Sequence, residues 1–75
     1  MTMTATAKAR HAAATRTKRQ FVGALVTLFP TRGQHHAEAL FRDLRAEATV
    51  EEIADVARPL EVLARRVATA RENRS

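Results

Sequence analysis

The chain has 75 residues, a net charge of +5 and no cysteine. This length permits one small domain, and the lack of cysteine excludes both a disulfide framework and thiolate metal ligands. Aromatic residues make up only 4% of the chain, which argues against a stacking platform for single-stranded nucleic acid. The remaining classes are a compact helical bundle and a chain that shares its core with a second copy.

The charge is distributed unevenly along the chain. Residues 1–37 carry six cations and no acid, whereas residues 38–75 carry seven arginines and eight acids. A basic end on a nearly neutral body is typical of an arm that binds a polyanion, such as DNA, RNA or an anionic membrane surface. The alternative is a solubilising tail. The cations proposed to contact phosphates are Lys8, Arg10, Arg16, Lys18 and Arg19.

Residues 1–14 form a low-complexity segment with no large apolar residue after Met3. Such a segment buries too little surface to offset the entropy lost on ordering, so we expect a disordered basic arm. Its alanines favour helix, which the arm could adopt on a partner. Residues 15–72 form the predicted helical domain.

The first predicted helix covers residues 15–29, with Thr15 or Thr17 as its N-cap. The apolar run Phe21–Phe29 supplies its core face, and at nine residues it is too short to span a bilayer, which needs about 20. Gly23 and the β-branched residues of the run lower helix propensity, so a strand is the alternative.

A turn and a second helix follow. Pro30 stops the first helix and Gly33 permits positive φ, so residues 30–33 are predicted to form a turn. Apolar residues at helical spacing from Ala37 to Ala48 then predict a helix over residues 34–48.

The stretch from Thr49 to Arg71 carries the strongest local signals. Thr49 and Glu52 have the spacing of a capping box, which marks a helix start. Pro59 either kinks this last helix or divides it, so the all-α bundle has three helices or four. Apolar residues recur at the heptad spacing that forms a dimer seam: Ile53, Val56, Leu60, Leu63, Val67 and Ala70.

The same stretch resembles a helix-turn-helix unit. In such units a small residue lies where the two helices touch, and Ala54 would occupy that place, with residues 61–71 as the recognition helix. The family usually has glycine in the turn, whereas this chain has Arg58-Pro59. The alternative is one amphipathic bundle helix with a solvated arginine face. The resemblance implies that four arginines contact DNA: Arg58, Arg65, Arg66 and Arg71.

We therefore expect a small cytoplasmic DNA-binding protein, such as a regulator or a plasmid- or phage-type accessory factor. The alternative is a helical interaction or dimerisation module, docking as a homodimer or on another protein through the apolar stripe Ile53, Val56, Leu60, Leu63 and Val67. RNA binding through the same arm is a third hypothesis.

Catalytic and metal chemistry are not indicated. The acids are spaced like the surface charges of helices, and no glycine-rich phosphate loop or nucleophile motif is present. His35 and His36 are neighbours that point about 100° apart on a helix, so with Glu38 they do not form an evident set of three ligands. We expect no enzyme activity, no cofactor, no metal and no transmembrane segment.

Overall fold

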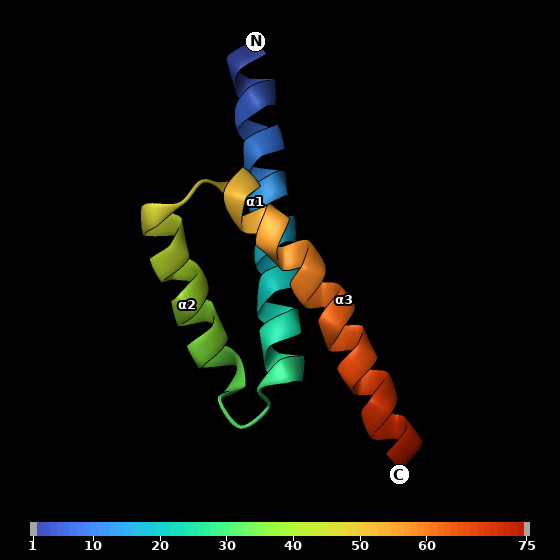
Figure 1. The fold of residues 1–75 in the computed structure, drawn as a ribbon. Helices are drawn as coiled ribbons and strands as arrows, with labels where there is room; N and C mark the ends of the chain where they lie inside the picture. The colour runs from blue at the N-terminus through green and yellow to red at the C-terminus, as the bar shows by residue number, and fades with distance from the viewer. Residues whose placement is uncertain (1, 75) are drawn as a thin grey trace.

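The computed structural model describes the backbone of residues 2–74 and the side chains of residues 8–74, and this part of the chain contains three helices and no strand. The helices are α1 (Thr2–Leu28), α2 (Gly33–Glu47) and α3 (Val50–Arg74). Helix α1 lies between the other two (Figure 1). Helix α2 runs antiparallel to α1 and α3 runs parallel to it, while α2 and α3 diverge from each other (Figure 1). The predicted all-α bundle is confirmed, and the helix predicted over residues 15–29 forms as part of α1 and ends at Leu28, so this segment is not a strand.

Helix α1 begins earlier than the predicted start at Thr15 or Thr17. Thr15 lies within the helix, where its hydroxyl donates to the carbonyl of His11 at 3.0 Å, and Thr17 is buried, so neither residue is an N-cap. The backbone of residues 2–14 continues the core part of α1, which removes the cost of nucleating a separate helix. Side chains from Lys8 to Ala14 are exposed or half-buried, so helix propensity supports this segment more than packing does. The division into a 1–14 arm and a 15–72 body stays a prediction.

The turn between α1 and α2 forms as predicted. The amide of Phe29 donates to the carbonyl of Leu25 at 2.8 Å, and the amide of Arg32 donates to the carbonyl of Phe29 at 3.0 Å. Pro30 cannot continue the helical hydrogen bonding, and Gly33 adopts a φ of +79°, which strains any other residue. Helix α2 therefore leaves the turn in the reverse direction, beside the second half of α1.

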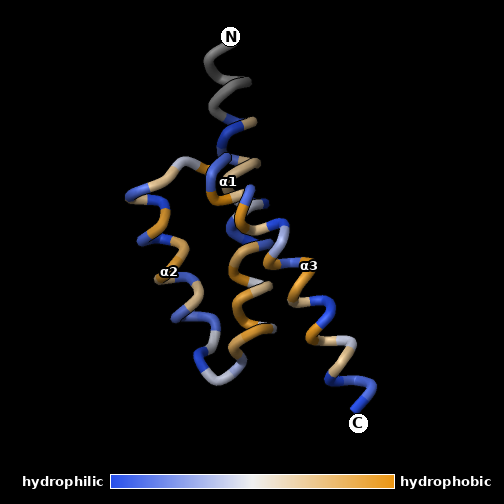
Figure 2. The backbone as a smooth tube through the Cα atoms, viewed as in Figure 1, coloured by the Kyte–Doolittle hydropathy of each residue, from blue (hydrophilic) through white to orange (hydrophobic). Residues whose placement is uncertain are grey.

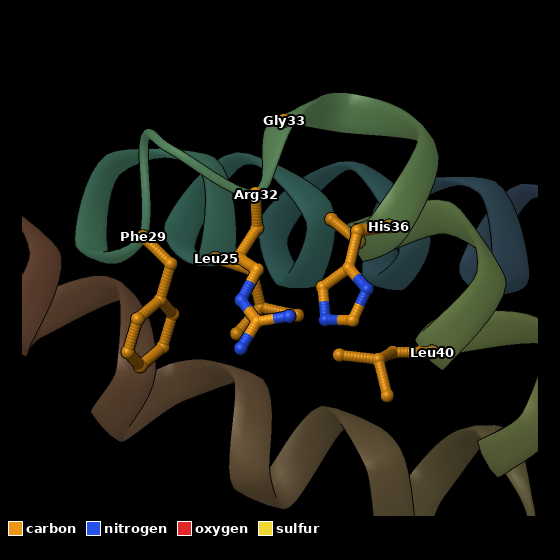
Figure 3. Close-up of a pocket in the computed structure, with 7 residues that line it drawn as sticks. Leu25, Phe29, Arg32, Gly33, His36 and Leu40 are labelled. Carbon is orange, nitrogen blue, oxygen red and sulfur yellow. The ribbon is translucent and has the colours of Figure 1, made fainter.

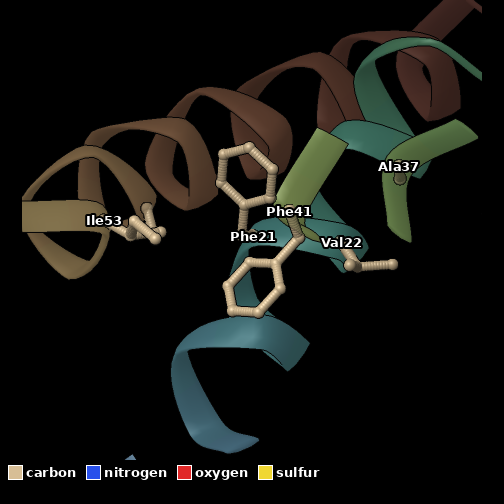
Figure 4. Packing of buried hydrophobic residues seen from close by; sticks show 6 residues of the cluster. Phe21, Val22, Ala37, Phe41 and Ile53 are labelled. Atoms are coloured by element: carbon tan, nitrogen blue, oxygen red, sulfur yellow. The ribbon is translucent and has the colours of Figure 1, made fainter. Parts of the chain in front are cut away.

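The core lies where α1 meets both neighbours. The rings of Phe21 and Phe41 are tilted by 50° with their centroids 5.9 Å apart, within the range of favourable aromatic pairs. Val22, Ala37 and Ile53 are buried with them (Figure 4). The core thus ties one turn of each helix together, which fixes where the remaining parts of α2 and α3 project.

The capping box predicted for the start of α3 is confirmed. The amide of Glu52 donates to the Thr49 hydroxyl at 3.2 Å, and the amide of Thr49 donates to the Glu52 carboxylate at 2.9 Å. These hydrogen bonds, chiefly the one from the Thr49 amide, hold the pKa of Glu52 below its usual value. The helix start is therefore fixed by local sequence alone.

Helix α3 is not divided at Pro59. It runs unbroken through this residue to Arg74, so the two-helix unit with a turn at Arg58-Pro59 is absent. The helix-turn-helix interpretation is wrong as a description of this fold. Once packing and capping hold both sides of a proline in helical conformation, the helix tolerates the lost hydrogen bond to the carbonyl of Asp55.

Candidate nucleic-acid interface and apolar groove

Four of the five cations of α1 lie on the side of the helix opposite Thr17, Phe21 and Ala24. The buried positions of the helix include Thr17, Phe21 and Ala24. At about 100° per residue, Lys8, Arg16, Lys18 and Arg19 project from the opposite half of the helix. All four are exposed, as is Arg10, which lies nearer the N-terminus than the core contacts. We call Lys8, Arg16, Lys18 and Arg19 the basic face of α1, and Arg10 projects to the other side of the helix beyond the core.

Helix α2 adds two cations that were not predicted as binding residues. Arg42 and Arg45 line a shallow hollow of about 430 Å³ with Lys18, Glu38 and Phe41. The hollow thus has three cations and one acid, and both arginines are exposed. The sequence did contain one indication of this cluster, because residues spaced three apart lie on one side of a helix. The packing of α2 on α1 brings this side next to Lys18.

The predicted DNA-contacting arginines of α3 are not gathered into one surface. Arg65 pairs with Glu61 one turn earlier, and it lines a second hollow with Arg19. Arg71 donates to the backbone carbonyl of Thr27, which ties the last turns of α3 to the end of α1. Arg58 and Arg66 are exposed but lie at different angles around the helix. Arg65 therefore lies near the basic face of α1.

The predicted heptad stripe is divided between core and solvent. Ile53 is buried and Leu60 and Val67 are half-buried, whereas Val56 and Leu63 are 51% and 46% exposed. The contact with α1 is centred instead on Ile53, Ala57 and Ala64, because small side chains allow two helices to approach closely. The side of α3 that carries Val56 and Leu63 is left uncovered.

The uncovered side of α3 faces an apolar groove between α2 and α3, with α1 as its floor. The end of this groove is a hollow of about 280 Å³, where Leu25, Phe29 and Leu40 project into the space toward α3 beside Arg32 and His36 (Figure 3). Hydrophobic positions occupy the second half of α1 and recur along α2 and α3 (Figure 2). We define the apolar groove by its large exposed side chains: Phe29, Leu40, Leu44, Val56 and Leu63.

Other kinds of site receive no geometric support in the described part of the chain. Among residues 8–74, no three His, Cys, Asp or Glu side chains are placed to hold a metal ion together. Over the described helices, none has the length and apolar character needed to cross a membrane. Comparisons with protein family models, with curated proteins and with solved structures find no match to this chain. Function is therefore argued from the two surfaces above.

Proposed function

We propose that this protein binds duplex DNA by neutralising backbone phosphates with the basic face of α1. The observation that carries the proposal is the exposure of every α1 cation, in a half of the chain with no acid before Glu38. A continuous helix holds these cations at fixed spacing, so less side-chain and backbone freedom is lost on binding than from a flexible arm.

The hollow beside Lys18 extends this surface. Arg42 and Arg45 lie next to Lys18 and Glu38, and guanidinium groups bind phosphate oxygens in a bidentate manner. A phosphate in the hollow would contact α1 and α2 together. Arg71 is not part of the proposed surface, because it already bonds the Thr27 carbonyl.

This mechanism is independent of base sequence, because phosphate contacts position a protein without reading base edges. It fits an accessory factor that coats or bends DNA better than a regulator that selects one operator. The continuous α3 supports this narrower form, since no separate recognition helix is available to enter a groove.

The test is the salt dependence of duplex DNA binding for two charge-matched variants. Lys8→Gln with Arg16→Gln removes two cations of the basic face, and Arg58→Gln with Arg74→Gln removes two exposed cations of α3. We expect the first variant to lower the slope of log affinity against log salt by about 0.9 for each lost phosphate contact, and the second to leave it near that of the unaltered chain.

Equal losses in both variants would show that net charge alone drives binding, and the basic face would lose its role. An affinity that does not change with salt would overturn the proposal, since counterion release requires this dependence. Duplex RNA that competes more strongly than duplex DNA of equal length would assign the surface to RNA.

A further inference from the structure

The bundle leaves much of its apolar surface uncovered. Its radius of gyration is 14.4 Å, against about 11 Å for a compact chain of this length. Among residues 8–74, four of the eight buried apolar residues are alanines, and no large side chain is completely buried. Meanwhile five larger apolar side chains stand exposed along the apolar groove. A small chain without cysteine has no disulfide to add stability, so covering such a groove with protein would stabilise it.

The charges beside the groove separate into two ends. Toward the α2–α3 connection, the exposed acids Asp43 and Glu47 lie beside Leu40 and Leu44 on α2. At the opposite end lie Arg32, beside the α1–α2 turn, and Arg66, in the second half of α3. Helical periodicity places Arg66 about 60° from Leu63 around α3, beside the exposed stripe. One end of the groove is thus acidic and the other basic.

We propose that a second copy of this chain covers the groove, forming a two-fold symmetric dimer. In a two-fold contact the same surface serves both copies, so the groove must complement itself. Antiparallel pairing of the two α3 helices meets this condition. It places the acidic end of each groove against the basic end of the other, and it brings the apolar stripes together between them. Parallel pairing would oppose like charges at both ends.

The first test compares two equally exposed valines that project from different sides of α3. Val56 and Val62 lie on the same helix and are 51% and 52% exposed, but Val62 lies about 120° around α3 from Val56, outside the exposed stripe. We expect Val56→Gln to weaken dimerisation by at least about tenfold, because both copies lose a buried contact, and Val62→Gln to leave it unchanged. The measurement is sedimentation equilibrium over a concentration series, in which the dimer has twice the 8.3 kDa of one chain.

The second test addresses orientation. Arg32→Glu with Arg66→Glu makes both ends of the groove acidic, and we expect this variant to be monomeric where the unaltered chain is dimeric. Adding Asp43→Lys with Glu47→Lys to the same chain reverses the pattern and should restore the dimer. All of these side chains are exposed in the single chain, so circular dichroism should report unchanged helix content.

An unaltered chain that stays at the mass of a monomer throughout the concentration series would overturn the proposal and leave the groove to a different partner. Equal effects of Val56→Gln and Val62→Gln would place the contact elsewhere. A dimer lost in the arginine variant but not restored by the lysine changes would refute the antiparallel arrangement. None of these outcomes depends on DNA binding.

Discussion

Replacing Pro59 by alanine should stabilise this protein considerably. Pro59 lies inside α3, where the amide of any other residue would donate to the carbonyl of Asp55. Proline is about 3 kcal/mol less favourable than alanine in a helix interior. Because Pro59 is exposed, its ring contributes little packing that alanine would lose. The free energy of unfolding should therefore rise by about 3 kcal/mol.

The assay is urea denaturation followed by circular dichroism at one fixed protein concentration, since dimerisation would otherwise alter the result. In thermal unfolding, the same change should raise Tm by roughly 12–24 °C, from about 4–8 °C for each kcal/mol in a domain of this size. Pro30→Ala is the matched control, because Pro30 lies in the turn and removes no helical hydrogen bond. Unaltered or lower stability in Pro59→Ala would refute the reasoning and indicate a chain that turns at Arg58-Pro59.

Three further substitutions test the core and the caps. Phe41→Ala should lower the free energy of unfolding by about 3–5 kcal/mol in the same denaturation assay, because it removes the ring that packs on Phe21. Thr49→Ala should cost about 1 kcal/mol through loss of the N-cap, and full stability in this variant would contradict the capping box. The pKa of Glu52 in the folded chain lies below its usual 4.5. The contribution of Glu52 to the free energy of unfolding is therefore fully present above pH 4.5 and is lost as the pH falls through the pKa of the folded chain. The stability difference between the unaltered chain and Glu52→Ala should therefore shrink in acid, more than the difference for Glu51→Ala, and denaturation at a series of pH values measures both.

The features that local sequence specifies were predictable. The capping box depends on two side chains three residues apart, and both of its hydrogen bonds form. The turn at Pro30 and Gly33 follows from the restricted φ of proline and the free φ of glycine. In each case the physical cause lies within a few residues, so a single sequence contains it.

The features that depend on packing were harder to predict. The heptad spacing identified the apolar residues of α3 but not which of them face α1, because Ala57 and Ala64 make the close contact and Val56 and Leu63 do not. Similarly, the effect of Pro59 depends on how firmly both halves of α3 are held. Arg42 and Arg45 lie beside Lys18 because α2 packs against α1. These features depend on contacts between residues that lie far apart in the sequence.

The contact between parallel helices has a consequence for how quickly the chain folds. Arg71 donates to the carbonyl of Thr27, which lies 44 positions earlier in the sequence, and all of α2 falls within that interval of the sequence. Long-range contacts slow folding because the intervening chain must be ordered before they form. We therefore expect the α1–α2 hairpin to form first, so that Ala37→Gly slows refolding, whereas Ala64→Gly in the late-docking α3 mainly accelerates unfolding.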